Sequence, residues 1–375
     1  MNDKVKIAQV IGCNAKGGVE SVVFNYYEFI DKTKFQFDFI IHNNSPHEIP
    51  KKILDLGCGV YKIPPYKHIF SYIKTLKYLF RKNSYTIVHS HMSTISIFTL
   101  LAAKLAKVPV RISHCHVTAG RGKGEFLRNI FKYILRPFSK IFPTHYFSCS
   151  EHAGKWLFGK KTFERGDVTV INNAINIETF LYNEQARCNI RKELNIDDKY
   201  VIGNVGRFAP QKNHSFMIEV FNVISKRSDN SILLLAGNGP LKGKIWKQIE
   251  SFKLQDKVKI LENVENISEL YQAMDVFILP SLYEGLGMVA IEAQAAGLPT
   301  IVSTKVPKEA KLFDFTQFLD LEDSPETWAE FILAKRDFKR ENVAGESSIK
   351  AFSIKNEAQK LEEIYQGLYN DKIMR

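Results

Sequence analysis

The chain has 375 residues, 45% of them hydrophobic and 25% charged, with a formal net charge of +12. This length exceeds one typical core and fits two domains, and the composition is that of a soluble globular protein. No apolar run reaches the roughly 18–20 residues of a membrane span, and the start MNDKVKIAQVIG lacks a signal-peptide pattern, so we expect a cytoplasmic protein. The positive charge comes without a nucleic-acid recognition motif, so we expect no nucleic-acid partner.

Strand-like and helix-like segments alternate along almost the whole chain. This alternation predicts an α/β fold of parallel sheets covered by helices on both faces. In the first half, strands are expected near 5–11, 37–42, 59–63, 86–90, 109–114, 145–149 and 168–171. In the second half, they are expected near 200–205, 231–236, 258–261, 276–280 and 299–302.

A polar, helical stretch near 176–198 separates the two series of strands and helices. We therefore expect an N-terminal domain of residues 1–180 and a C-terminal domain of residues 181–353. Apolar positions at helical spacing from Ile354 to Tyr369 predict one last helix. Ligands of open α/β sheets bind outside the carboxyl ends of the strands, so a cleft between the two domains is the expected binding place.

The first strand leads into the loop CNAKGGVE, where Gly17 and Gly18 precede the helical run VVFNYYEFI. Two glycines at this point indicate the strand-to-helix turn of a Rossmann-like unit. Glu20 is the last residue of this loop.

Histidines gather at the ends of two expected strands. His89 and His91 occur in TIVHSH, and His114 and His116 occur in RISHCH. A single histidine is more often a satisfied polar residue than a catalytic one. Two such pairs on strand ends that face a cleft favour a functional role.

The segment FLRNIFKYILRPFSKIF, residues 126–142, is basic and amphipathic. Its cations recur every four residues, at Arg128, Lys132, Arg136 and Lys140. Such a helix suits an anionic membrane surface, with Pro137 kinking or ending it. The alternative is a helix packed on the sheet of the first domain with a solvated basic stripe.

Two segments in the second half consist of an apolar strand followed by a loop that contains glycine. In VIGNVGRFAPQKNH, Arg207 follows the strand and Lys212 begins the next helical pattern. A guanidinium and an ammonium on one loop can hold a diphosphate from two directions. Residues 232–239, ILLLAGNG, repeat the arrangement of an apolar strand and a glycine-rich turn.

The most informative segment is SLYEGLGMVAIEAQAAGLP, which contains Glu284 and Glu292. This pattern places the first carboxylate in a loop and the second about two turns inside a helix, on nearly the same face. Gly285 and Gly287 allow a tight turn and leave free N–H groups at the helix N-terminus, where a phosphate is favoured. Carboxylates on both sides of an anion site suit the hydroxyls of a sugar nucleotide.

These motifs together resemble the retaining glycosyltransferases of family 4. The resemblance rests on Glu284-x7-Glu292, on Arg207 with Lys212, and on the early loop GGVE, and it covers nearly the whole chain. The segments LPSLYEGLGMVAIEAQAAGLP and INNAIN look most like bacterial enzymes that build capsule, exopolysaccharide or O-antigen chains. The resemblance implies the GT-B architecture, two Rossmann-like domains facing each other across a cleft, with the helix of about 354–375 packing back on the first.

The resemblance also implies residue roles. Glu284 would hold the hydroxyls of the donor sugar rather than act as a nucleophile, and Glu292 would hold the ribose. His116 would contact the transferred sugar, with His114 as the alternative of the same H-x-H pattern. Asn173 would order the interdomain loop, although an Asx turn explains it equally well. The donor-binding set is Gly17, Gly18, Asn173, Arg207, Lys212, Val264, Glu284, Gly285, Leu286, Gly287, Met288, Val289 and Glu292.

The leaving diphosphate needs positive charge around it, and many glycosyltransferases supply a metal on an acidic D-x-D motif. No such motif occurs at a plausible strand end here, whereas Arg207, Lys212 and the amides of Gly287 to Val289 supply positive potential. We therefore expect no metal and no other cofactor. The five cysteines include no C-x-x-C pair and fit reduced thiols better than a zinc site.

The expected donor is a nucleotide sugar, UDP-linked by family frequency, with GDP possible. The expected acceptor is a lipid-linked saccharide, which favours peripheral contact of the basic helix with the inner face of the cell membrane. Two alternatives remain open, a GT-B nucleotide-sugar epimerase and a non-catalytic subunit that supports a partner transferase. The full set of Arg207, Lys212, Glu284 and Glu292 argues against the silent subunit.

Overall fold

The computed structural model describes residues 4–13, 18–116, 126–264 and 266–373, without the side chains of 126–129, 372 and 373. The chain divides into two compact units. The first unit holds the described residues up to Ile175 and those from Ala351 onward, and the second runs from Asn176 to Lys350. The sequence placed this boundary slightly later, at 180/181.

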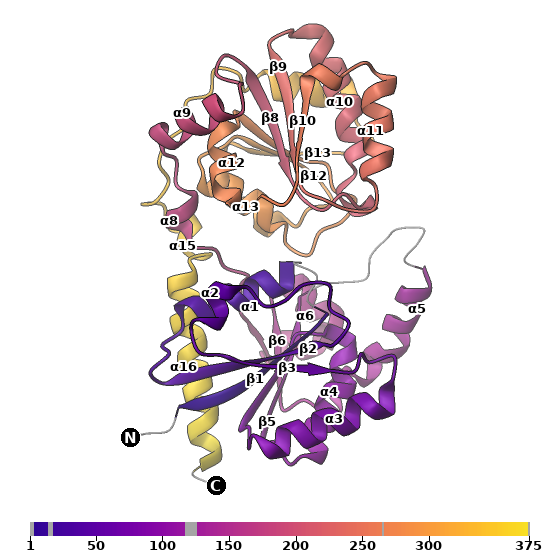
Figure 1. Cartoon of the computed structure of the whole chain (residues 1–375), viewed down its shortest axis with the longest axis vertical. Coiled ribbons are helices and arrows are strands. Elements are labelled where there is room, and N and C mark those ends of the chain that lie inside the picture. Colours follow the sequence, from indigo (N-terminus) through magenta and orange to yellow (C-terminus); the bar gives the residue numbers. More distant parts are fainter. Residues whose placement is uncertain (1–3, 14–17, 117–125, 265, 374–375) are drawn as a thin grey trace. The chain divides into compact units, whose positions relative to one another are not determined.

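The first unit is built on a seven-stranded parallel sheet with the order β3-β2-β1-β4-β5-β6-β7 (Figure 1). All seven strands were predicted, to within two residues at each end. The buried runs of valine, isoleucine and phenylalanine in these strands are typical of a sheet covered on both faces. The strands are β1 Val5–Gly12, β2 Phe35–His42, β3 Gly59–Ile63, β4 Ile87–Ser90, β5 Val110–Cys115, β6 His145–Ser148 and β7 Val168–Val170.

Helices cover both faces of the first sheet. Helices α1 and α16 contribute to the core cluster on one face, and α3 and α4 contribute to the cluster on the other. The helices are α1 Gly18–Phe29, α2 Lys51–Leu54, α3 Ile69–Lys82, α4 Ser96–Leu105, α5 Phe126–Leu135, α6 Glu151–Phe158, α7 Lys160–Glu164 and α16 Ile354–Ile373.

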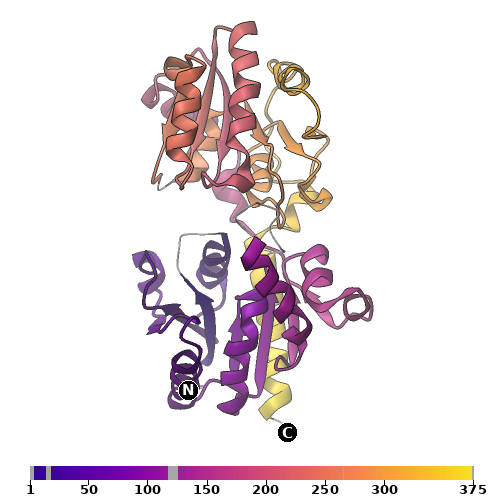
Figure 2. The ribbon, with the colours of Figure 1, turned by 90° about the vertical axis from the view of Figure 1, so that its right-hand side faces the viewer.

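Helix α16 belongs to the first unit although it comes last in the chain. It runs along the sheet of that unit in both ribbon views (Figures 1 and 2). Ile354, Ala358, Leu361 and Tyr365 are buried and recur at helical spacing, so they form one apolar stripe that packs on the sheet. The first unit therefore contains strands from the start of the chain and a helix from its end.

The second unit is built on a six-stranded parallel sheet with the order β10-β9-β8-β11-β12-β13. Five of its strands were predicted, and the edge strand β13 was not. The segment TQFL of β13 begins with two polar residues, Thr316 and Gln317, so only its last two residues are apolar. The strands are β8 Tyr200–Val205, β9 Ser231–Ala236, β10 Val258–Leu261, β11 Val276–Leu279, β12 Thr300–Ser303 and β13 Thr316–Leu319.

The second sheet is also covered on both faces. Helices α10, α11 and α14 pack in one core cluster, and α9, α12 and α13 pack in the other. The helical connection expected near 176–198 is formed by α8 and α9. The helices are α8 Ile177–Phe180, α9 Glu184–Glu193, α10 His214–Arg227, α11 Lys242–Ser251, α12 Ile267–Ala273, α13 Met288–Ala295, α14 Pro325–Leu333 and α15 Ser347–Lys350.

Candidate active site

The loop after β8 carries the two cations singled out in the sequence. Arg207 follows the strand directly, is exposed, and makes no ion pair with any described residue. Lys212 ends the 3₁₀ turn Pro210–Lys212, and Asn213 then takes a left-handed conformation with φ of 53° before α10 begins. The two cations therefore lie on one loop but in different surroundings, because Lys212 is largely buried.

Glu284 is the partner of Lys212. The Lys212 ammonium lies 2.7 Å from Glu284 Oε1, and their side chains are only 14% and 7% exposed. The Ser281 hydroxyl donates to the same carboxylate oxygen at 2.6 Å, and Gln211 Nε2 donates to Oε2 at 3.2 Å. A cation and two neutral donors fix the orientation of this carboxylate, as a group that binds hydroxyls requires.

Three residues after Glu284, the chain turns into α13 through Gly287. This glycine has φ of 85° and ψ of 49°, a left-handed conformation that a side chain would strain. A Cβ built on it would lie 3.1 Å from Val306 Cγ1. No side chain caps this helix N-terminus, so the N–H groups of its first turn, at Met288 and Val289, can bind an anion. Leu286 is buried below the turn.

Glu292 lies four residues after Met288, about one helical turn inside α13. The prediction of two turns was wrong because the loop extends further, to Gly287. Glu292 Oε2 accepts a hydrogen bond from the Tyr271 hydroxyl at 2.7 Å. Burial raises the pKa of the Glu292 carboxyl, while the Tyr271 hydrogen bond and the Lys212 charge oppose that shift. Glu284 and Glu292 thus have separate partners.

Other predicted donor-site residues are less distinctive. Val264 is half-buried between β10 and α12 and packs on the core of the second unit. Gly18 is the first residue of α1, and Glu20 is buried in its first turn. Gly17 lies outside the described residues.

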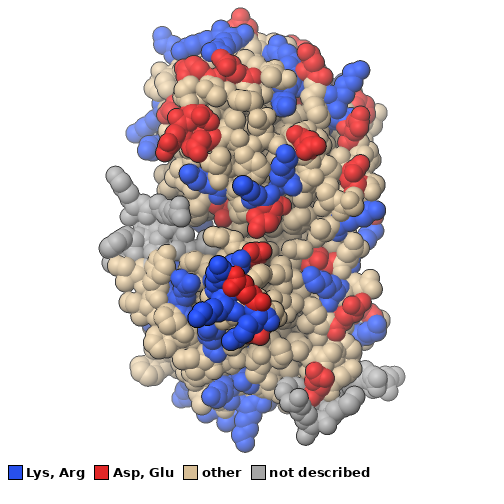
Figure 3. Space-filling view, turned by 180° about the vertical axis from the view of Figure 1, so that it is seen from behind, with Lys and Arg blue, Asp and Glu red and all other residues tan. Residues whose placement is uncertain are grey.

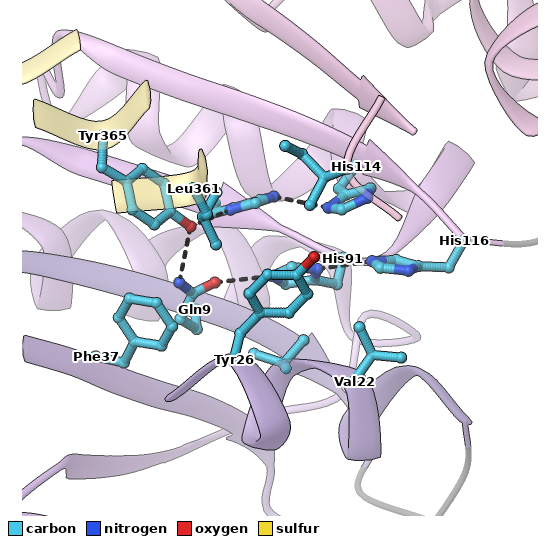
Figure 4. A pocket seen from close by; sticks show the side chains of 12 residues that line it. Gln9, Val22, Tyr26, Phe37, His91, His114, His116, Leu361 and Tyr365 are labelled. Carbon is cyan, nitrogen blue, oxygen red and sulfur yellow. Dashed lines mark hydrogen bonds between the residues drawn. The ribbon is translucent and has the colours of Figure 1, made fainter. Parts of the chain in front are cut away.

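The four strand-end histidines lie together in the first unit (Figure 4). His89 belongs to β4 and His114 to β5, while His91 and His116 follow the ends of the same two strands. Residues two apart on a strand share a face, so all four rings lie on the face that α1 and α16 cover. The rings of His89 and His91 are stacked at 4.2 Å, and those of His114 and His116 at 3.9 Å.

All four imidazoles are buried, and burial lowers the pKa of each. The pKa of His116 falls to about 4, although its contact with Asn173 raises it slightly, and those of His89, His91 and His114 lie well below the usual value. His116 directly follows β5, and its Nδ1 lies 3.4 Å from Asn173 Oδ1. His114 lies within the strand, and its Nε2 has no hydrogen-bond partner.

His89, His91 and His114 each have a ring nitrogen within 4.8 Å of the other two, which raises the question of a metal. A metal ion lies in the plane of each imidazole that binds it, about 2.0–2.1 Å from the nitrogen. The nearly parallel, stacked rings of His89 and His91 do not direct their lone pairs to one point. Their ring nitrogens are also already hydrogen-bonded to protein groups. The cluster therefore fits a metal poorly.

Several site residues were not predicted from the sequence. Ser281 and Gln211 hold Glu284, Tyr271 holds Glu292, and Gln9 with Tyr365 joins the histidines. Except for Ser281, these residues are distant in sequence from the groups they contact. Gln9 shares the first strand with Lys6, so its polarity alone does not single it out in the sequence.

The two parallel sheets, each covered by helices on both faces, match the GT-B fold. The structure superimposes on Anabaena HepE in complex with UDP and glucose with a TM-score of 0.80, covering 96% of this chain and 99% of that one at 15% identity. WaaG, a glycosyltransferase of lipopolysaccharide biosynthesis, gives a TM-score of 0.68 at 13% identity, with 95% of both chains covered.

Sequence comparison identifies the family. Residues 16–179 match the family described as Glycosyltransferase Family 4, and residues 186–330 match Glycosyl transferases group 1. The chain is 33% identical over 357 residues to the Bacillus subtilis protein named putative glycosyltransferase EpsF, covering 92% of this chain and 93% of that protein. The protein therefore belongs to these glycosyltransferase families, and the predicted family is confirmed.

Two further relatives have more specific names. An Escherichia coli UDP-Gal:α-D-GlcNAc-diphosphoundecaprenol α-1,3-galactosyltransferase is 27% identical over 314 residues, 80% of each chain. The Staphylococcus aureus capsular polysaccharide biosynthesis glycosyltransferase CapH is 25% identical over 369 residues, 96% of this chain and 98% of that protein. Among the described residues, no helix is both long and apolar enough to cross a membrane.

Proposed function

We propose that this glycosyltransferase moves a sugar from a UDP-sugar to a lipid-linked saccharide during synthesis of a bacterial surface polysaccharide, with retention at the anomeric carbon and without a metal. The named relatives support the substrate classes. One acts on UDP-Gal and a diphosphoundecaprenol-linked sugar, and another belongs to capsule biosynthesis. HepE, which shares the fold, binds UDP and glucose.

The observation that carries this proposal is the carboxylate of Glu284 beside the uncapped N-terminus of α13. Lys212, Ser281 and Gln211 fix the carboxylate, and Gly287 directs the amides of Met288 and Val289 outward from the helix start. A sugar hydroxyl donates to the fixed carboxylate, while the diphosphate accepts from the amides. Few ligands other than a sugar linked to a diphosphate need both groups side by side.

The remaining roles in this proposal are those that the family resemblance implies. Arg207 and Lys212 bind the diphosphate, Glu292 binds the ribose hydroxyls, and His116 contacts the transferred sugar. In the reaction, the bond from the anomeric carbon to the diphosphate oxygen breaks while the acceptor oxygen bonds to the same face of that carbon. The proton of the acceptor hydroxyl passes to the departing diphosphate, and Arg207 with the α13 amides stabilises the negative charge there.

Donor turnover with and without acceptor tests this function. We expect slow hydrolysis of a UDP-sugar alone and fast transfer when a lipid-linked saccharide is added. An epimerase would release an altered nucleotide sugar without acceptor, and a non-catalytic subunit would do neither. A thermal-shift series with UDP-, GDP- and dTDP-sugars identifies the nucleotide, and stabilisation by GDP-sugars alone would contradict the UDP assignment.

We also propose that the segment of α5 and the following 3₁₀ helix, Arg136–Lys140, contacts an anionic membrane. Leu135 is buried, but six other large apolar side chains here are 41% to 58% exposed, which favours the membrane over the alternative of a helix packed on the sheet. Helix α5 ends at Leu135, before Pro137. The exposed apolar side chains are Ile130, Phe131, Tyr133, Ile134, Phe138 and Ile141.

The charges on this segment match an anionic lipid surface. Lys140 is exposed, and Lys132 and Arg136 are half-buried. Each cation near acidic lipid contributes about 1 kcal/mol. The side chain of Arg128 lies outside the described residues.

On the face shown in Figure 3, basic side chains are interrupted by acidic ones, so the described residues of that face form no continuous basic stripe for a nucleic acid.

Sedimentation with liposomes tests the membrane contact. We expect the wild-type protein to bind vesicles of anionic phospholipid at low salt and to dissociate as salt rises. Glutamine at Arg128, Lys132, Arg136 and Lys140 should weaken binding. The matched control places glutamine at four exposed lysines of the second unit, Lys226, Lys244, Lys247 and Lys253, with the same change of net charge. Wild-type protein left in the supernatant at low salt, or equal loss in both variants, would overturn the proposal.

A further inference from the structure

One continuous hydrogen-bonded chain links His116 to His114 through the interior of the first unit (Figure 4). His116 Nε2 lies 2.8 Å from His91 Nδ1, and His91 Nε2 lies 2.7 Å from Gln9 Oε1. Gln9 Nε2 donates to the Tyr365 hydroxyl at 3.1 Å. That hydroxyl lies 2.6 Å from His89 Nδ1, and His89 Nε2 lies 3.0 Å from His114 Nδ1.

The histidines of this chain are neutral near pH 7. Burial lowers the pKa of every imidazole in the cluster, to about 4 for His116. The side chains that face the rings are apolar or uncharged, with Tyr26 from α1 and Tyr365 from α16 as the other titratable groups. Glu357 of α16 interacts with Tyr26 and lies at hydrogen-bond distance from Asn172. A neutral imidazole has one N–H and one lone pair, so each ring can only donate at one nitrogen and accept at the other.

The orientation of the Gln9 carboxamide selects one direction for the whole chain. Its Nε2 can only donate, and it lies 3.1 Å from the Tyr365 hydroxyl. Tyr365 therefore accepts from Gln9 and donates its own proton to His89 Nδ1 at 2.6 Å. The other end of the carboxamide, Oε1, must then accept from His91 Nε2–H.

The direction at Gln9 determines the proton position on His116. His91 has its proton on Nε2, so its Nδ1 can only accept, and His116 must donate to it from Nε2. His116 Nδ1 is then left with a lone pair. Its 3.4 Å separation from Asn173 Oδ1 is longer than an ordinary hydrogen bond and does not require a proton there. On the other branch, His114 has its proton on Nε2, the buried nitrogen that lacks a partner.

We infer that Gln9 is a positioning residue that, through His91, holds His116 in the tautomer whose Nδ1 offers a lone pair at the end of β5. The tautomer is inferred from the hydrogen bonds alone, and only the use assigned to it rests on the proposed function. A lone pair at that position accepts a hydrogen bond from a hydroxyl of the transferred sugar, whereas the opposite tautomer would donate to Asn173 and offer none. A carboxamide is suited to this role because it has one donor end and one acceptor end and cannot itself titrate.

Nitrogen-15 NMR of histidine-labelled protein tests the inference without any substrate. The chemical shifts of the two ring nitrogens tell which one carries the proton, and His116→Asn identifies the signal of His116. We expect wild-type His116 to be protonated on Nε2 alone. Gln9→Glu, an acceptor towards His91, should keep this tautomer. Gln9→Met, which offers neither donor nor acceptor, should give a mixture that includes His116 protonated on Nδ1.

A control variant separates this effect from general loss of stability. Thr99→Val removes a buried hydroxyl bonded to Tyr72 on the opposite face of the same sheet, and should leave the His116 tautomer unchanged. In transfer assays, Gln9→Met should lower kcat roughly tenfold to a hundredfold with little change in the KM of the donor, as when a histidine loses its orienting partner.

Two results would overturn the inference. One is a wild-type His116 protonated on Nδ1, and the other is a tautomer that is the same in wild type and Gln9→Met. If Gln9→Met does not fold, the wild-type spectrum and Gln9→Glu still decide the question. A correct tautomer in a protein without transfer activity would count against the proposed function and leave the role of Gln9 intact.

Discussion

The two units share one scaffold, yet they place different chemistry at the ends of their strands. In the first unit, the strand ends carry four neutral imidazoles joined by a carboxamide and a phenol. In the second unit, they carry an ion pair, Lys212 with Glu284, and an uncapped helix N-terminus. The same parallel sheet therefore supports a neutral hydrogen-bonded network in one unit and a charged site in the other.

This difference shows which property each unit controls. A charged group acts on a ligand through the Coulomb interaction, which changes slowly with distance. Its position therefore needs to be fixed only approximately. A neutral imidazole works through which nitrogen holds the proton, and that depends on every bond along the chain. We therefore expect turnover to be sensitive to the loss of charged groups in the second unit, and to changes in the histidine tautomers in the first unit.

Removing the cations should give the largest effect. Arg207→Ala and Lys212→Ala should each lower turnover about a hundredfold to a thousandfold, because each deletes a contact to the departing diphosphate. Lys212→Ala should also destabilise the second unit by about 1–3 kcal/mol, since it leaves Glu284 without its cation, whereas Arg207→Ala should not. Steady-state kinetics and urea unfolding measure both effects. Lys226→Ala is the control, and near-normal turnover in both variants would refute the diphosphate role.

Acid should destabilise the first unit more than the second. The pKa of His116 is about 4 when folded and near 6.5 when unfolded, so its contribution to stability is present above pH 6.5 and is lost as pH falls through 4. This loss amounts to about 3 kcal/mol, and the other buried histidines of the first unit add to it. In the second unit, His214 acts in the same sense, whereas Glu292, whose pKa is raised, contributes stability at low pH that is lost as pH rises.

The experiment is denaturant unfolding between pH 7 and 4, followed by tryptophan fluorescence. Trp156 lies in the first unit, and Trp246 and Trp328 lie in the second. The Trp156→Phe variant reports the second unit alone. We expect the transition of the first unit to move to lower denaturant much faster as pH falls. Equal shifts of both transitions would contradict the contrast between the units.

Gly287→Ala should have a smaller effect. The left-handed conformation at this residue costs a side chain about 1–2 kcal/mol, and the added methyl group would press on Val306. We expect a lower midpoint of thermal unfolding and weaker binding of UDP in calorimetry. Gly243→Ala, in the first turn of α11 where an added Cβ meets open space, is the matched control and should stabilise by roughly 0.4–1 kcal/mol. Equal behaviour of the two variants would show that the turn before α13 is not constrained.

Chelation should have the smallest effect. If cations and amides alone stabilise the leaving diphosphate, EDTA leaves turnover unchanged. Loss of activity that returns with magnesium or manganese would show that the charged site of the second unit includes a metal.

Much of the fold followed from the sequence, because parallel strands are continuous apolar runs and helices show their own period. The site followed only in part. The sequence singled out the loops with Arg207, Lys212 and Glu284, but the ion pair joins residues 72 positions apart, and no local pattern specifies it. The contact of Gln9 with Tyr365 spans 356 positions. The strand β13 was missed because TQFL begins with two polar residues and leaves only two apolar ones.

The return of α16 to the first unit has a consequence for biosynthesis. The strands that carry the histidines leave the ribosome roughly 250 residues before Tyr365, a delay on the order of 10–50 s at about 5–20 residues per second. Until then, the face of the sheet that α16 covers has neither its apolar partner nor the phenol that completes the network. Synthesis of the first unit begins first and ends last. A premature stop codon within α16 would therefore leave the N-terminal sheet without part of its covering helix.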